Sequence, residues 1–214
     1  MPKLAVRGWL YDRLIVGMTT DWYREVLARL PEGARVLDVG IGTGAAMSRC
    51  ADLVRDKDLT VVGLDIDADY VTRCHRELAR AGLSDRVEPL LASVYDHEGG
   101  PYDAVYFSAS LMLLPDPAAA ITHVVAQLVP GGRVFATQTF QQRRSKLMER
   151  AKPMIRHVTT IDFGRVTYED DFRACMTAAG VELVELHTMS ASRYLSHRLA
   201  VARVADDEAD RSAA

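Results

Sequence analysis

The sequence predicts an α/β fold in which a mostly parallel, doubly wound sheet is covered by helices on both faces. Strand-like and helix-like segments alternate along most of the chain, which is typical of parallel strands joined by helical crossovers. A glycine-rich turn follows the first predicted strand. The last two strand-like runs are separated only by residues 188–193, too few for a helical crossover. If they are neighbours in the sheet, we expect them to be antiparallel.

Seven segments have the composition of strands, with apolar runs bounded by turn residues. They lie at 34–39, 59–64, 86–91, 102–108, 132–139, 181–187 and 194–204. Six segments have the composition or spacing of helices. They lie at 19–30, 44–55, 68–81, 117–128, 142–157 and 168–179. We therefore expect a seven-stranded sheet.

Residues that cap helix ends support three of these helices. Asp67 places a carboxylate at a helix start, where it meets the positive end of the helix dipole. Asp116 followed by Pro117 gives an N-cap and a proline in the first turn. Thr167, with Asp170 three residues later, has the spacing of a capping box.

Composition excludes several classes of protein. The 214 residues are 49% apolar and suit one domain, which we expect to span residues 1–205. The net charge of −3 lacks the basic excess of nucleic-acid-binding proteins, so no nucleic-acid partner is expected. Three widely spaced cysteines argue against a disulfide framework and for a reducing compartment. Without a membrane-spanning stretch or secretory signal in the sequence, we expect a cytoplasmic protein.

Three segments fall outside the predicted core. Residues 1–18 are apolar and aromatic without periodicity, and residues 141–165 interrupt the path from the fifth strand to the next helix. Both are expected near the carboxyl edge of the sheet, where ligands bind in such folds, and we interpret them as a cap over a substrate. The alternative for residues 1–18 is that they cover one end of the core. Residues 206–214 are expected to form a disordered tail.

The end of the first predicted strand is the most informative part of the chain. Asp38 is followed by Gly40, Gly42 and Gly44, which predicts a tight turn into a helix. About twenty residues later, the second strand ends in Asp65, where an acid can bind ribose hydroxyls. The glycines also satisfy the relaxed dinucleotide fingerprint, so an NAD-dependent oxidoreductase remains an alternative. An acid beside the turn suits an ammonium or sulfonium better than a pyrophosphate.

An acid followed by G-x-G-x-G resembles the first motif of the class I S-adenosylmethionine-dependent methyltransferases. Residues 61–67, 101–108 and 128–134 are similar to later motifs of that superfamily, in the same order. The resemblance implies a Rossmann-like seven-stranded sheet with an antiparallel last strand. It also implies direct SN2 transfer of a methyl group from S-adenosylmethionine, leaving S-adenosylhomocysteine. The chain looks most similar to the quinone and small-metabolite methyltransferases, which implies a small-molecule acceptor.

The resemblance also implies roles for individual residues. Asp38 would face the amino group of the cofactor, the glycines would admit its methionine half, and Asp65 would accept the ribose hydroxyls. Ser93 stands where many relatives carry an acid for the adenine amino group, and Asp96 is the alternative if the register slips. The implied cofactor-binding residues are Asp38, Gly40, Gly42, Gly44, Asp65, Ile66, Ser93, Val94 and Ser108.

Candidates for contact with the acceptor are Tyr11, Ser110, Met112 and His157. The apolar run 111–114 either lines a substrate pocket or belongs to the core. The six histidines lack metal-ligand spacing, so no metal is expected. No catalytic base is assigned, because a sulfonium methyl is already activated and some acceptors need little assistance from a base.

The stretch 143–156 carries six cations among apolar residues at roughly helical spacing. Such a helix suits an anionic membrane surface, so a phospholipid or other lipid methyltransferase with peripheral membrane contact is an alternative. A solvated charged face is the simpler interpretation. A third alternative is a cofactor-binding protein without activity, because binding and turnover use different residues. The sequence does not indicate the oligomeric state.

Overall fold

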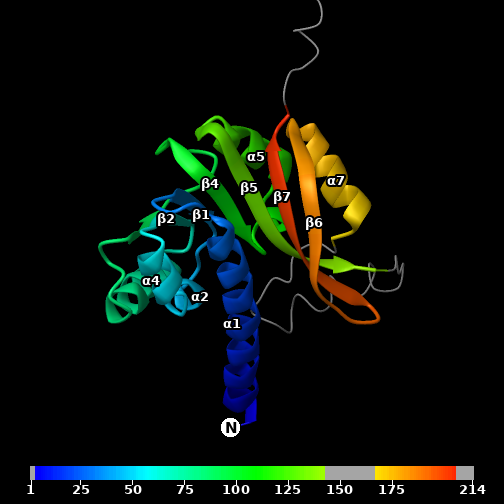
Figure 1. The fold of residues 1–214 in the computed structure, drawn as a ribbon. Coiled ribbons are helices and arrows are strands. Elements are labelled where there is room, and N and C mark those ends of the chain that lie inside the picture. Colours follow the sequence, from blue (N-terminus) through cyan, green and yellow to red (C-terminus); the bar gives the residue numbers. More distant parts are fainter. Residues whose placement is uncertain (1–2, 143–166, 206–214) are drawn as a thin grey trace, which may run out of the picture.

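The computed structural model describes residues 3–142 and 167–205, with the side chains of the first helix described from residue 16 onward. One seven-stranded sheet runs through it, in the order β3-β2-β1-β4-β5-β7-β6 (Figure 1). The strands are β1 (Arg35–Val39), β2 (Thr60–Asp65), β3 (Val87–Leu91), β4 (Tyr102–Ser108), β5 (Leu128–Gln141), β6 (Val181–Ala191) and β7 (Leu195–Val204). All neighbours pair in parallel except β7, which is antiparallel to both β5 and β6. The predicted fold class and the antiparallel final pair are confirmed.

Strands β5 and β6 are longer than the sequence predicted. β5 pairs with β7 from Arg133 opposite Arg203 to Gln141 opposite Leu195. This pairing carries β5 past the end of β4, because Ser108, the last residue of β4, is level with Thr137. Residues 188–191, which we expected in the connection between the last two strands, belong to β6. Long-range pairing with a neighbour overrides their weak strand propensity.

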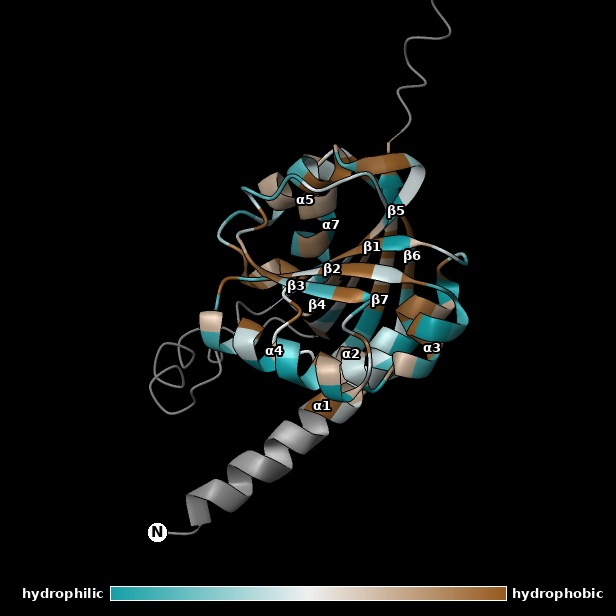
Figure 2. Cartoon of the chain, turned by 90° about the vertical axis from the view of Figure 1, so that its left-hand side faces the viewer, coloured by the Kyte–Doolittle hydropathy of each residue, from teal (hydrophilic) through white to brown (hydrophobic). Residues whose placement is uncertain are grey.

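Helices cover both faces of the sheet. They are α1 (Lys3–Arg29), α2 (Ala45–Ser48), α3 (Ala51–Asp56), α4 (Ala68–Arg80), the 3₁₀ helix η1 (Leu111–Leu113), α5 (Pro117–Val125) and α7 (Glu169–Ala178). Side chains of α1 to α4 pack on one face, and those of η1, α5 and α7 pack on the other. Adjacent residues of β1, Val36 and Leu37, belong to opposite cores, so this central strand is buried on both faces. Figure 2 shows the largely apolar strands of the sheet and the largely hydrophilic ribbon of α4 beside them.

Helix α1 begins at Lys3, whereas the sequence predicted a helix from residue 19 and a non-periodic segment before it. That prediction was wrong because it relied on an apolar stripe, and a helix shows such a stripe only where it packs against a core. The N-terminal turns of α1 project beyond the sheet (Figure 1). Residues 3–18 are therefore helical, and their role as a cap remains a prediction.

The predicted helix 44–55 is two short helices, α2 and α3. The N–H groups of Arg49 and Cys50 donate to carbonyl groups three residues earlier, which tightens the chain and ends α2. All three cysteines are free, as expected. The predicted helix 142–157 beyond its first residue, the segment 143–165 and the tail 206–214 lie outside the described residues. No helix in the described part of the chain is long and apolar enough to cross a membrane.

The predicted caps have mixed outcomes. Asp67 caps α4 by accepting from the N–H groups of Asp69 and Tyr70, and Asp116 caps α5. The capping box at Thr167 is wrong, because α7 begins after Tyr168 without a side-chain cap. Thr167 instead forms a parallel bridge with Phe140 and accepts a hydrogen bond from Gln138. The capping pattern in the sequence cannot distinguish these two uses of a threonine.

The surroundings of Gly63 in β2 and of Gly17 in α1 predict opposite effects for substitution by alanine. A Cβ at Gly63 would lie 2.4 Å from Cδ1 of the buried Ile41, so Gly63→Ala should destabilise the fold by about 1–3 kcal/mol. A Cβ at Gly17, in α1, would meet nothing within 4 Å, so Gly17→Ala should stabilise the fold by about 0.5–1 kcal/mol. Urea unfolding of both variants tests the pair, and equal effects would contradict the packing argument.

Candidate functional site

The three glycines after β1 all adopt positive φ angles, 85° at Gly40, 60° at Gly42 and 70° at Gly44. They differ in what surrounds them. A Cβ at Gly40 would lie 2.7 Å from Cβ of Ser110, and one at Gly44 would lie 2.6 Å from Sγ of Cys74. A Cβ at Gly42 would meet nothing within 4 Å. Two of the glycines therefore allow the protein to pack against itself, and only Gly42 faces open space.

The turn is held against the end of β2. The N–H groups of Gly40 and Ile41 donate to the carbonyl oxygen of Leu64, at 2.8 and 3.1 Å. The N–H of Gly42 donates to Oδ2 of Asp65 at 3.0 Å, and the N–H of Asp67 donates to Oδ1 at 2.9 Å. Each oxygen of an ionised carboxylate has two lone pairs, so Asp65 keeps one acceptor position on each oxygen. Asp65 thus lies beside the turn in a fixed orientation.

Asp38, the last residue but one of β1, is fully buried. Its Oδ2 accepts a hydrogen bond from the hydroxyl of Tyr23 at 2.6 Å. Its Oδ1 is buried and has no hydrogen-bond partner among the described residues. Burial raises the pKa of Asp38 from 3.8 to about 7; the Tyr23 hydrogen bond opposes this rise, and the negative charge of Asp65 adds to it. A buried acceptor without a partner is costly, which makes Oδ1 a candidate for contact with a ligand.

Tyr23, the hydrogen-bond partner of Asp38, was not predicted from the sequence. Tyr23 lies on α1, is buried, and meets the ring of Tyr106 edge-on with ring centroids 5.0 Å apart. The hydroxyl of Tyr106 is hydrogen-bonded to Oγ1 of Thr137 at 2.8 Å. The sequence contains no pattern that pairs Tyr23 with an acid fifteen residues later on a different element. Only the packing of α1 against the sheet brings them together.

The predicted adenine-binding residues lie at the ends of β2 and β3. Ile66 follows Asp65 and is 79% exposed, an unusual position for a large apolar side chain. Oγ of Ser93 accepts from the N–H of Tyr95 at 3.2 Å, so this hydroxyl already has one local bond. The side chain of Val94 is buried, and Asp96 is exposed. Their roles in binding adenine remain predictions.

The end of β4 and the residues after it lead to Ser110, which lies against the glycine turn. Ser108 is half-buried, and Ala109 adopts a φ of 56°, a left-handed conformation that is strained for alanine. Ser110, a predicted substrate contact, donates its hydroxyl hydrogen to the carbonyl of Val39 and so braces the turn. Met112 is half-buried and packs against the core on the side of the sheet covered by α5 and α7. Of the run 111–114, Leu111 is therefore core.

Two other predicted substrate contacts lie where no side chain is described. Tyr11 is on α1, in the part without described side chains, and His157 is outside the described residues. His197, not singled out from the sequence, lies on the part of β7 that pairs with the end of β5. Its Nδ1 is 2.9 Å from Oγ1 of Thr139, and burial lowers its pKa. Its ring is 5.5 Å from that of Trp22, so α1 also packs here.

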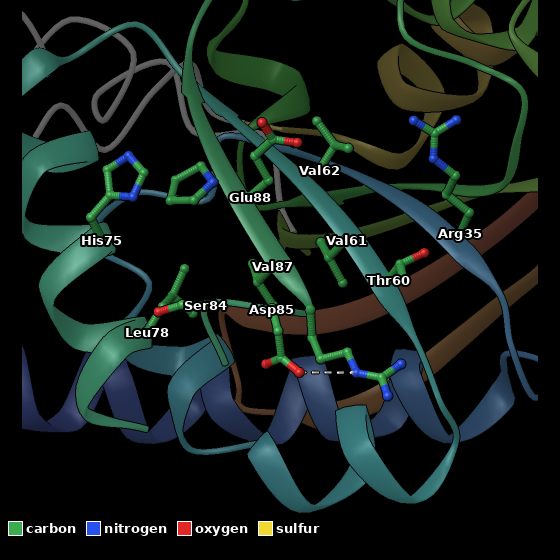
Figure 3. A pocket seen from close by; sticks show the side chains of 12 residues that line it. Arg35, Thr60, Val61, Val62, His75, Leu78, Ser84, Asp85, Val87 and Glu88 are labelled. Atoms are coloured by element: carbon green, nitrogen blue, oxygen red, sulfur yellow. Dashed lines mark ion pairs between the residues drawn. The ribbon is translucent and has the colours of Figure 1, made fainter. Parts of the chain in front are cut away.

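A separate hollow of about 490 Å³ lies between α4 and the beginnings of β1, β2 and β3 (Figure 3). Arg35 and Thr60, the first residues of β1 and β2, line it together with His75 of α4 and Asp85. Ligands of open α/β sheets bind at the carboxyl ends of the strands, and this hollow includes the opposite ends. We assign the functional site to the glycine turn.

Comparison with known proteins identifies relatives. A family described as a methyltransferase domain matches residues 11–186. A ubiquinone biosynthesis O-methyltransferase of Xanthomonas axonopodis pv. citri is 35% identical over 111 residues, covering 51% of this chain and 45% of that protein. An aklanonic acid methyltransferase of a Streptomyces species is 32% identical over 132 residues, covering 59% of each. The chain thus spans about half the length of these curated relatives.

Solved structures share the fold. Geranyl diphosphate C-methyltransferase from Streptomyces coelicolor A3(2), in complex with Mg²⁺, geranyl diphosphate and S-adenosylhomocysteine, superimposes with a TM-score of 0.68 at 12% identity, covering 88% of this chain and 78% of that one. The cyclase SpnF gives a TM-score of 0.68 at 20% identity, covering 86% and 81%. At these identities, the likeness concerns the fold alone.

The raised pKa of Asp38 predicts how the stability of the ligand-free protein depends on pH. With a pKa of about 7 when folded and 3.8 when unfolded, the folded state retains a proton that the unfolded state loses. The resulting stability is fully present below about pH 4 and is lost as the pH rises to about 7. Asp38→Asn cannot ionise, and its carbonyl can still accept from Tyr23. It should be more stable than the wild type at about pH 8, by on the order of 1–4 kcal/mol, and nearly equal at about pH 4.

Urea unfolding of the ligand-free proteins at both pH values measures this difference. A difference in unfolding free energy that does not change with pH would contradict the burial of an ionisable Asp38.

Proposed function

Because this chain belongs to the methyltransferase domain family, we propose that it binds S-adenosylmethionine and transfers the methyl group to a small-molecule acceptor. The observation that carries the proposal is the buried Oδ1 of Asp38, which has no partner among the described residues. A cationic ammonium group satisfies both its charge and its free lone pairs. The open space at Gly42, four residues after Asp38, gives a ligand room beside the backbone.

The residues around the turn fit the parts of this cofactor. Asp38 would accept from the amino group, and Asp65 has one free acceptor position on each oxygen for the two ribose hydroxyls. Ile66 offers an exposed apolar surface for the face of the adenine. The remaining proposed contacts are Ser93 and Val94, which follow β3, and Ser108, the last residue of β4. None of these roles requires a metal ion.

When bound, S-adenosylmethionine supplies a methyl group on a sulfonium, which a nucleophile displaces directly. The protein's contribution is to hold the reactants in line and to exclude water, which makes the reaction effectively unimolecular. We propose no catalytic base. Residues 1–205 would form one domain, with residues 1–18 and 141–165 as the cap over the acceptor, in a cytoplasmic protein.

A small-molecule acceptor is supported by the relatives. The names of two of them refer to ubiquinone biosynthesis and to aklanonic acid, and a structural neighbour holds geranyl diphosphate. The cyclase SpnF has the same fold, so the fold by itself does not establish methyl transfer. Transfer of a labelled methyl group to a panel of quinols, phenols and prenyl phosphates would identify the acceptor. Cofactor binding without turnover of any acceptor would favour a non-catalytic protein.

Substitution of two neighbouring acids tests the cofactor site. Asp65→Ala should weaken S-adenosylhomocysteine binding at least about 100-fold, because two hydrogen bonds to a charged acceptor and the anchor of Gly42 are lost. Asp67→Ala, two residues later, removes only the cap of α4. It should cost about 1 kcal/mol of stability and leave binding unchanged. Isothermal titration calorimetry of both variants measures the effect.

Titration with NAD is the control for ligand class. Binding of NAD but not of S-adenosylhomocysteine would overturn the proposed function, and equal losses in the two variants would remove the special role of Asp65.

A further inference from the structure

We propose that Tyr23 is a positioning residue whose hydroxyl occupies Oδ2 of Asp38. The proton of Asp38 and the ammonium group of the cofactor then compete for the other oxygen, Oδ1. Cofactor binding then releases a proton. The inference rests on the proposed function and concerns how the same site recognises its ligand.

Tyr23 is placed to act only as a hydrogen-bond donor. Its hydroxyl is 2.6 Å from Oδ2, and its side chain is 3% exposed. Burial and the nearby Asp38 hold its pKa well above the ordinary value, so the phenol keeps its proton at any pH at which the protein functions. The edge-on contact with Tyr106 and the packing of Val26 and Leu27 in the same core hold the ring in place. Oδ2 is therefore occupied in both charge states of Asp38.

Among the residues that the structure describes, the groups that face Asp38 do not include a cation. Tyr23 comes from α1, Tyr106 from β4, Cys74 from α4 and Asp65 from β2. Burial raises the pKa of Cys74 to about 12 and that of Tyr106 above its usual range, so both stay neutral. Asp65 is an acid and opposes ionisation of Asp38. Among the described residues nothing balances the Asp38 carboxylate, and a cationic ligand would supply that charge.

The exchange follows from these contacts. In the free protein below about pH 7, Asp38 carries a proton, and because Oδ2 accepts from Tyr23, that proton resides on Oδ1. The ammonium group needs the same oxygen as an acceptor. When it binds, the O–H bond on Oδ1 breaks, the carboxylate pairs with the ammonium, and one proton passes to the solvent. Above about pH 7, the carboxylate is already ionised, so binding releases none.

Calorimetry in buffers of different ionisation enthalpy counts the released protons. For the wild type titrated with S-adenosylhomocysteine, we expect close to one proton at about pH 6 and close to none at about pH 8.5. In Tyr23→Phe, loss of the hydrogen bond raises the pKa of Asp38 further, so proton release should persist to higher pH. Affinity at about pH 7.5 should fall about threefold for the first pKa unit gained and approach a tenfold fall for each further unit.

Two matched controls separate positioning from packing. Tyr106→Phe alters a buried tyrosine that touches Tyr23 but bonds to Thr137, so it should leave the proton count unchanged. The ligand 5′-methylthioadenosine lacks the amino-acid part of the cofactor. It should release no proton, and its affinity should be the same in the wild type and in Tyr23→Phe.

The outcomes are distinguishable. Equal changes for both ligands in Tyr23→Phe, or an unchanged proton count, would overturn the inference and make Tyr23 a packing residue. If Tyr23→Phe does not fold, Asp38→Asn serves instead: it should bind 5′-methylthioadenosine normally and release no proton with S-adenosylhomocysteine at either pH. Proton release from that variant would also overturn the inference. Failure of the wild type to bind either ligand would instead reject the proposed function.

Discussion

Three backbone N–H groups attach the turn after β1 to the end of β2. Two of them, from Gly40 and Ile41, donate to one carbonyl oxygen, and the third, from Gly42, donates to the carboxylate of Asp65. The absence of a side chain at Gly63 makes room for Ile41 beneath the turn. The acid before the turn, Asp38, and the acid at the end of β2, Asp65, are consequently held relative to each other by the protein backbone. A site built in this way is ordered before any ligand arrives, which lowers the entropy lost on binding.

The sequence was sufficient for features whose causes are local. The alternation of strand-like and helix-like segments predicted the sheet, and the spacing of Asp38, the glycines and Asp65 predicted the turn at the edge where we place the candidate site. Features with distant causes were missed. The N-terminal half of α1 carries no apolar stripe, and Thr167 uses its hydroxyl to accept from Gln138 instead of capping a helix. The partner of Asp38 depends on how a helix packs against a sheet, which no pattern in the sequence records.

The tight turn after β1 was predicted correctly from its glycines, but the reason given for the glycines was incomplete. We expected all three to make room for a ligand. Gly40 and Gly44 make room for Ser110 and Cys74, and Gly42 alone faces open space. The turn is therefore specified mainly by contacts with β4 and α4 inside the protein. Because these contacts and the ligand space occupy different positions of one short motif, the motif identifies the superfamily without indicating the acceptor.

Burial of Asp38 links the stability of the domain to its affinity. Helix α1 contributes the buried hydroxyl of Tyr23 to the acid, and the carboxyl group of Asp38 is fully buried, so water is removed from around it. Because no cation of the described residues lies beside Asp38, we expect its ionisation to destabilise the free protein as the pH rises toward neutrality. The low dielectric around Asp38 also strengthens its attraction for a positive charge, because a Coulomb interaction grows as the effective dielectric constant falls. If Asp38 binds the cofactor as proposed, the desolvation that weakens the ligand-free fold is the same effect that favours a cationic ligand.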